Sequence, residues 1–157
     1  MSISSVLKEL SSDEKMLIDL IWKRGPLTKT DLLDITKMKL TTLNRVMEPL
    51  ESKKILVEVG SAESTGGRKP TLYDLNPRNF FIIGVDIARP YTKVMFFNLK
   101  MENLCHYEFP MLETYTPKVT VDEIAHIVQC ATRGLNIGEG EILGIGVGTV
   151  GPLDHRQ

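Results

Sequence analysis

The side chains best suited to chemistry in this chain lie between residues 39 and 45, where short polar groups stand beside cations. They are Lys39, Thr41, Thr42, Asn44 and Arg45. In the major groove of DNA, an Asn amide can pair with adenine, an Arg guanidinium can pair with guanine, and a Thr hydroxyl can reach a phosphate. Leu40, Leu43 and Val46 are interleaved with them and are expected to face inward. A solvated helix face would have a similar composition, so this pattern alone leaves both interpretations open.

A second candidate site is the polar stretch from 60 to 69, which ends in Gly66-Gly67-Arg68-Lys69. Glycines lack a Cβ and let a backbone approach a phosphate closely, and the neighbouring Arg can lie in or near the minor groove. Gly67, Arg68 and Lys69 are therefore candidate DNA contacts. The alternative is an ordinary hairpin tip.

The remaining reactive residues do not form a catalytic or metal-binding pattern. His106, His126 and His155 are scattered, and Cys105 and Cys130 lack metal-ligand spacing. We expect no catalytic residue, metal or cofactor, and free thiols in a reducing cytoplasm. The sequence shows neither a signal peptide nor an apolar run of membrane-spanning length. The net charge is −1, but residues 23–54 carry eight Lys/Arg and four Asp/Glu, a local excess that suits phosphate contact.

The elements that would position the first cluster are three helices. Ser11 with Glu14, and Thr28 with Asp31, have the form of capping boxes that begin the first two. Met16, Leu17, Leu20 and Ile21 are the expected apolar face of the first helix, which ends at Gly25-Pro26. The third helix is expected over residues 40–53. Pro49 within it removes a hydrogen bond, so we expect a kink or an early break there.

A change to a period of two follows, with strands expected at 55–59 and 70–75 around the basic loop. Three helices followed by a hairpin is the order of a winged helix-turn-helix, which we assign to residues 1–76. Residues 79–157 predict strands at 80–87, 92–99 and 103–112, and a helix at 119–135 with Val121, Ile124, Ile127, Val128 and Ala131 inward. A final strand, expected to be buried, spans 142–148.

Together these segments resemble the ROK family (repressors, open reading frames and kinases), and most closely its xylose and N-acetylglucosamine repressors. The resemblance is carried by Ser64–Pro70 with Leu72 and Leu75-Asn76, by Ile83–Ile87, and by Ile142–Gly148 with Gly151–Asp154. It implies an α+β protein in which a winged helix-turn-helix precedes the N-terminal part of an actin/hexokinase-like (ribonuclease H-like) α/β domain. The chain would then be a shortened form, ending soon after the ROK domain begins.

The family's kinases carry an Asp-x-Gly-Gly-Thr phosphate loop. Here residues 86–92 read Asp-Ile-Ala-Arg-Pro-Tyr-Thr, so both glycines are replaced and Pro90 lacks a donor. The family's catalytic aspartate, sugar ligands and zinc-binding cysteines would lie beyond Gln157, and Asp154 is not assigned as a ligand. We therefore expect that this protein is not an enzyme.

The expected function is sequence-specific binding of double-stranded DNA by a cytoplasmic transcriptional repressor of carbohydrate-utilisation genes. The expected form is a homodimer, and the family resemblance adds a sugar effector for a full-length protein. Two alternatives remain open: a ROK-type sugar kinase with an accessory N-terminal domain, and a winged helix that binds protein.

Overall fold

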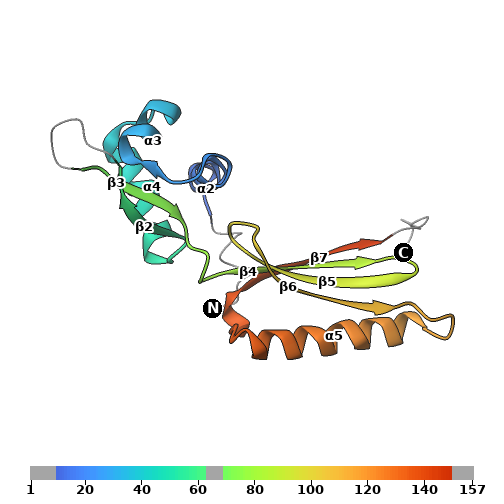
Figure 1. The fold of residues 1–157 in the computed structure, drawn as a ribbon. Coiled ribbons are helices and arrows are strands. Elements are labelled where there is room, and N and C mark those ends of the chain that lie inside the picture. Colours follow the sequence, from blue (N-terminus) through green and yellow to red (C-terminus); the bar gives the residue numbers. More distant parts are fainter. Residues whose placement is uncertain (1–9, 63–68, 150–157) are drawn as a thin grey trace. The chain divides into compact units, whose positions relative to one another are not determined.

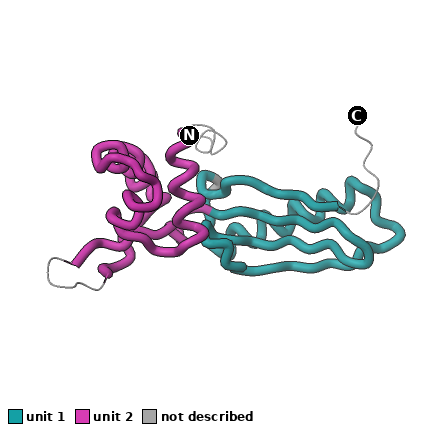
Figure 2. Tube along the Cα trace, turned by 90° about the horizontal axis from the view of Figure 1, so that it is seen from above, with its two compact units in different colours: residues 1–4, 81–157 teal, residues 5–80 magenta. Residues whose placement is uncertain are grey.

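The structure is a computed structural model that describes residues 10–62 and 69–149 (Figure 1). Two compact units make up the chain: residues 5–80 form one, and residues 81–157 with residues 1–4 form the other (Figure 2). Each unit holds its own sheet, one of three strands and one of four. The mixed α+β architecture predicted from the sequence is confirmed.

The first unit contains α2 (Ser12–Arg24), α3 (Lys29–Thr36) and α4 (Leu40–Ser52). Both predicted capping boxes are confirmed. The Ser11 amide donates to Glu14 Oε2 at 2.6 Å, and the Thr28 amide donates to Asp31 Oδ2 at 2.9 Å. At the end of α2, the Gly25 amide donates to the Ile21 carbonyl with Gly25 at φ 83°, a conformation that a side chain would strain. Local side-chain chemistry thus fixes where α2 and α3 begin.

A three-stranded antiparallel sheet completes this unit, in the order β1-β3-β2. The strands β2 (Leu56–Ser61) and β3 (Thr71–Leu75) pair as predicted. Both begin one residue later than expected, β2 ends two residues later, and β3 ends at Leu75 as expected. The two-residue strand β1 (Leu27–Thr28) was missed by the sequence analysis. It exists because Leu27 pairs with Tyr73. Such a distant pairing leaves no periodic pattern in two residues.

The centre of the core of the first unit is formed by side chains at most 1% exposed, drawn from α2, α3, α4, β2 and β3: Leu17, Ile21, Leu32, Leu43, Met47, Leu50, Leu56 and Leu75. The predicted inward position of Met16 is wrong, since it is 42% exposed. On a helix, Leu17 and Ile21 stand one above the other, whereas Met16 is about 100° away from Leu17. Only the Leu17–Ile21 row of α2 is fully buried.

Pro49 lies inside α4 without ending it, so the early break that the sequence suggested is wrong. The carbonyl of Pro49 still accepts from the Lys53 amide at 3.0 Å, and the Leu50 carbonyl accepts from the Ile55 amide at 2.8 Å. Leu50 is fully buried. Packing and these terminal bonds hold the last turn despite the missing donor.

The second unit contains β4 (Phe81–Ile87), β5 (Tyr91–Asn98), β6 (Asn103–Pro110), α5 (Pro117–Gly134), the short 3-10 helix η1 (Glu139–Glu141) and β7 (Ile142–Thr149). The sheet order is β6-β5-β4-β7, with β7 parallel to β4 and the other pairs antiparallel. Figure 1 shows α5 running along one face of this sheet. A parallel neighbour requires such a crossover, and α5 supplies it.

The face of the sheet toward α5 is apolar, and its core includes Phe81, Ile83, Val85, Val94 and Phe96. The sequence analysis predicted that the last strand, β7, is buried, and this prediction is wrong. Ile145 and Val147 on β7 are 54% and 62% exposed, although their partners on β4, Ile83 and Val85, are buried. Within the described residues β7 pairs only with β4, so its outer edge has no neighbour.

Val121 was expected to face inward on α5 and is instead 60% exposed, which corrects the sequence analysis. It lies at the margin of the apolar stripe of α5. In that stripe, Ala131 is part of the core, and Ile124, Ile127 and Val128 pack against the core.

Among the described residues, no helix combines the length and the apolar character that a membrane crossing needs.

Thr28→Ala should lower the free energy of unfolding by about 1 kcal/mol, because it removes the hydroxyl that accepts from the Asp31 amide and donates to Asp31 Oδ2 at 2.7 Å. Urea denaturation followed by circular dichroism measures the change. Thr30→Ala, at an exposed position of the same helix, is the matched control and should not destabilise. Equal effects of the two variants would contradict the assigned cap.

The hydrogen bonds from the Thr28 hydroxyl and amide lower the pKa of Asp31 below its ordinary value of 3.8. A carboxyl whose pKa is depressed by folding stabilises the fold above its unfolded pKa. That contribution should be complete above about pH 4 and disappear as the pH falls through the lower, folded pKa. NMR titration should show a higher Asp31 pKa in Thr28→Ala than in the wild type, and an unchanged value would refute this origin of the shift.

Candidate nucleic-acid interface

Helix α4 presents one polar and one apolar face. Thr41, Asn44, Arg45 and Glu48 are all exposed. Their spacing of i, i+3, i+4 and i+7 places them on one side of a helix. The opposite side carries Leu43, Val46, Met47 and Leu50, all at most 6% exposed. The N-terminal half of the polar face is neutral or basic, and its first acid is Glu48. Thr42 lies on the flank of this face and is half-buried.

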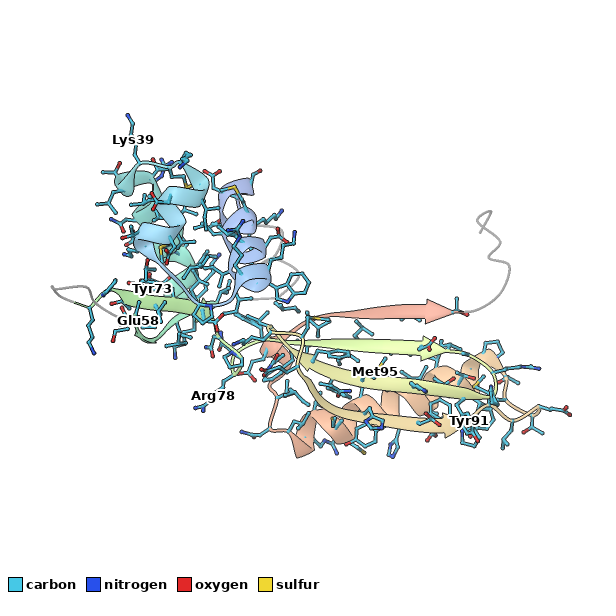
Figure 3. All side chains as sticks on the ribbon, turned by 45° about the horizontal axis from the view of Figure 1, so that its top comes forward. Lys39, Glu58, Tyr73, Arg78, Tyr91 and Met95 are labelled. Carbon is cyan, nitrogen blue, oxygen red and sulfur yellow. The ribbon has the colours of Figure 1, made fainter. Side chains whose placement is uncertain are left out.

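The N-terminus of α4 differs from those of the other described α-helices. Side chains of Ser11, Thr28 and Thr116 cap α2, α3 and α5, whereas Lys39 stands at the cap position of α4 and makes no side-chain cap bond. The first amides of a helix have no partner within it and carry partial positive charge. Lys39 is exposed and projects away from α4 (Figure 3). This helix end therefore combines amides that no cap side chain engages with the positive charge of Lys39.

Leu40 was expected to face inward and is 53% exposed, so that prediction is wrong. The buried side chains of α4 begin one turn later, with Leu43 and Met47, because the first turn of α4 extends beyond the core. The exposed Leu40 adds an apolar group beside Thr41 at the positive end of α4.

Lys29, the first residue of α3, connects α4 to the sheet. Its Nζ donates to Asn44 Oδ1 at 2.9 Å and lies 5.4 Å from the ring centroid of Tyr73. The Tyr73 hydroxyl donates to Glu58 Oε1 at 3.4 Å, and both residues are marked in Figure 3. Burial raises the pKa of Tyr73, and the charges of Glu51 and Glu58 raise it further, so the hydroxyl keeps its proton.

Lys29 was missed by the sequence analysis as a functional residue. Its contact with Asn44 spans 15 positions, and its place over Tyr73 depends on the pairing of β1 with β3. Neither leaves a local pattern. The one available signal is a lysine directly after the Thr28 cap.

For the predicted basic loop, Gly67 and Arg68 lie outside the described residues. Lys69 is exposed just before β3. The amide of Ala62 donates to the Pro70 carbonyl at 2.9 Å and closes the base of the loop.

In the second unit, the residues that match the kinase phosphate loop are held apart. Asp86 pairs with Lys93 and is exposed, while Thr92 pairs with Ile87 and is fully buried. Successive strand residues face opposite sides of a sheet, so the Asp86 and Thr92 side chains point away from each other. A hollow at this end of the sheet is lined by Ile87, Ala88, Arg89, Met111 and Thr149. In this hollow, Ala88 and Arg89 stand at the positions that match the two glycines of the Asp-x-Gly-Gly-Thr loop.

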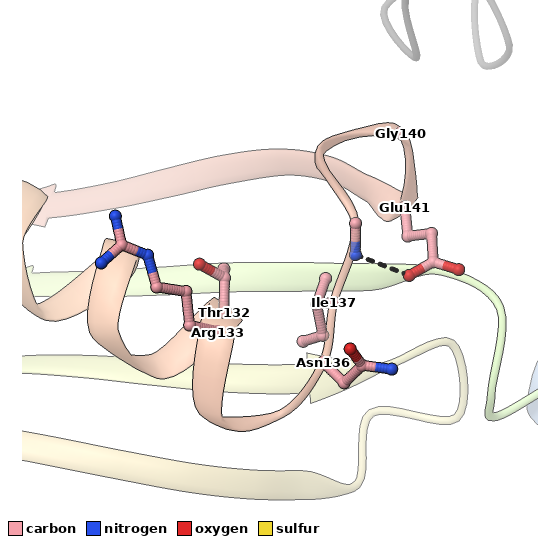
Figure 4. A pocket seen from close by; sticks show the side chains of 7 residues that line it. Thr132, Arg133, Asn136, Ile137, Gly140 and Glu141 are labelled. Atoms are coloured by element: carbon pink, nitrogen blue, oxygen red, sulfur yellow. Dashed lines mark hydrogen bonds between the residues drawn. The ribbon is translucent and has the colours of Figure 1, made fainter.

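A second hollow lies at the C-terminal end of α5 (Figure 4). Its lining includes Arg133 and Glu141, and Glu141 Oε2 already accepts from the Gly138 amide at 2.8 Å.

Among the described residues, no group of three His, Cys, Asp or Glu side chains comes together as a metal site. Cys105 and Cys130 are free, and Cys130 Sγ lies 3.7 Å from His126 Nε2.

No family model matches the chain. The xylose repressor of Bacillus spizizenii is 23% identical over 145 residues, which are 92% of this chain and 38% of the repressor. The Escherichia coli protein described as the DNA-binding transcriptional dual regulator NagC is 25% identical over 108 residues, or 69% of this chain and 26% of that protein. The chain thus spans less than two fifths of the length of these relatives.

The fold is similar to that of the corresponding part of one solved structure. A crystal structure of a ROK family transcriptional regulator, a homologue of the E. coli MLC protein, superimposes with a TM-score of 0.64 at 14% identity, covering 88% of this chain and 35% of that one. Together with the xylose repressors and NagC, this match confirms the resemblance to ROK-family repressors.

Leu43→Ala should lower the free energy of unfolding by about 2–5 kcal/mol, because Leu43 is fully buried under the polar face of α4. Leu40→Ala, the same change three residues earlier at an exposed position, should change it by less than about 0.5 kcal/mol. Chemical denaturation of the two variants measures the difference. Similar losses would show that Leu40 packs in solution.

Proposed function

We propose that this chain is a sequence-specific DNA-binding transcriptional regulator that represses carbohydrate-utilisation genes. In this proposal residues 1–76 form a winged helix-turn-helix, and residues 79–157 form the N-terminal part of a ROK domain. The order α2, β1, α3, α4, β2, β3 is compatible with that assignment, with α4 as the recognition helix. The name of the xylose repressor to which this chain is similar supports the carbohydrate link.

The observation that carries the proposal is the uncapped, lysine-bearing N-terminus of α4, beside an exposed Thr41, Asn44 and Arg45. DNA offers phosphates to the uncapped amides and to Lys39, and base edges to the side chains one turn further along. Thr42 on the flank is suited to a phosphate. Leu43 and its row hold this face at a fixed orientation, which a base-reading surface requires.

The loop between β2 and β3 is the wing of this proposal. Lys69 adds an exposed cation at its base. With Gly67 and Arg68 it would contact the flanking backbone or the minor groove.

The protein is proposed to be a regulator without enzymatic activity. The relatives named above are called repressors or regulators, and Ala88 and Arg89 occupy the place of the phosphate-loop glycines of the family's kinases. A sugar effector belongs to the proposal for a longer protein, in which it would alter the arrangement of two DNA-binding heads.

A second copy of the chain is the proposed protein partner. Within the described part of the chain, the outer edge of β7 has no strand neighbour, its Ile145 and Val147 are exposed, and Ile142–Thr149 contains no charged residue. An uncharged edge strand is a template for pairing. A homodimer would also present two recognition helices to a two-fold operator.

The DNA proposal is tested by fluorescence anisotropy on a duplex selected from a genomic library, at two salt concentrations. Wild-type affinity should fall with a log–log slope of about −0.9 per phosphate contacted. Arg45→Ala should cost about tenfold or more on the selected duplex and much less on a random one, since base contacts carry specificity. Arg133→Ala removes the same charge from an exposed position on α5 and is the matched control.

Folded wild-type protein that fails to bind any duplex at low salt would refute the DNA-binding proposal. A winged helix that binds protein would then be the better interpretation.

Val147→Lys should shift the protein toward monomer, because a charge on the β7 edge opposes strand pairing. Sedimentation velocity over a range of concentrations measures the shift. Val119→Lys changes an apolar residue that is 43% exposed on α5, outside the strands of the sheet, and should leave association unchanged. Equal association of the wild type and Val147→Lys would exclude this edge as the dimer interface.

A further inference from the structure

We propose that Lys29 sets the base preference of the recognition helix by engaging the amide oxygen of Asn44. The inference rests on the proposed DNA-binding function and adds a specificity-determining residue to it. Lys29 is on α3, outside the polar face of α4, and acts through Asn44 as a positioning residue.

The first step is the chemistry of the contact. Lys29 Nζ lies 2.9 Å from Asn44 Oδ1. An ammonium group donates hydrogen bonds and accepts none, so the amide oxygen, and not the amide nitrogen, must face it. The two N–H groups of Asn44 are then the part of the amide left for a ligand.

The second step is that Lys29 is held in place. Its ammonium lies over the Tyr73 ring, and Tyr73 is only 7% exposed. The Tyr73 hydroxyl is bonded in turn to Glu58, and Leu27, two residues before Lys29, pairs with Tyr73 across the β1–β3 ladder. A cation over an aromatic face is attracted to it, which limits the positions that the lysine adopts.

The third step is the consequence for base recognition. An unconstrained Asn reads adenine by using its oxygen and its nitrogen together. With its oxygen engaged by Lys29, Asn44 offers donors, and the nearby ammonium offers more. Guanine presents two acceptors, N7 and O6, in the major groove, whereas adenine presents one acceptor and one donor. The Lys29–Asn44 pair therefore favours guanine at the base that Asn44 reads.

The test uses the duplex selected by the wild-type chain, in four versions that differ at the base pair where Asn44→Ala abolishes discrimination. The wild type should prefer guanine to adenine there by about tenfold, the size of one well-made base contact. Lys29→Met keeps the apolar stem and frees the Asn44 oxygen, so the ratio of the two Kd values should shift toward adenine by about tenfold. Lys29→Arg keeps a donor-only cation and should retain the guanine preference.

Two controls separate specificity from charge. Lys15→Met removes one positive charge from an exposed position on α2 and should leave the ratio unchanged. In an Asn44→Ala background, Lys29→Met should lower affinity for all four duplexes alike. The ratio of Kd values is the readout because a merely electrostatic or structural role of Lys29 would not move it.

The outcomes distinguish the two proposals. If the wild type binds DNA and Lys29→Met leaves the guanine-to-adenine ratio unchanged, the role of Lys29 is refuted while the DNA-binding function stands. If the folded wild type binds no duplex, both proposals fall.

Discussion

The arrangement of the first unit depends on the burial of one row of side chains, Leu43, Val46, Met47 and Leu50. These residues hold α4 against α2, α3 and β2. Because a helix has a fixed period, burying this row also determines that Thr41, Asn44 and Arg45 point outward. The row keeps α4 helical through Pro49 as well. The hydrophobic core thus sets the orientation of the polar face to which we assign DNA recognition.

In the second unit, one helix covers only part of one face of the sheet, and the burial of the strands differs accordingly. The strands β4 and β5 bury an apolar cluster beneath α5, and β7 extends the same sheet with its side chains half-exposed. Register alone would place Ile145 and Val147 with the core residues Ile83 and Val85. Burial depends on what lies above a strand as well as on its position in a sheet, and no described element covers β7.

Local signals made much of the fold predictable from the sequence. The boxes at Ser11–Glu14 and Thr28–Asp31 located the starts of two helices, and alternation located the strands β2 and β3. Tertiary relations were not predictable: the strand β1, the exposure of Leu40 and β7, and the contact of Lys29 with Asn44 all depend on distant residues. Thr41, Asn44 and Arg45 were recognised as candidates because their spacing is local, whereas Lys29 could be found only in the folded chain.

The division of the chain into two units, each with its own sheet and apolar core, affects how its stability is described. Two cores need not melt together, and a single midpoint or a single unfolding enthalpy is well defined only for an all-or-none transition. Calorimetry on the whole chain therefore has to test for one or two transitions before a mutational effect is assigned. If there are two, a substitution in α3 or α4 belongs to the transition of residues 5–80, and one in β7 to that of the other unit.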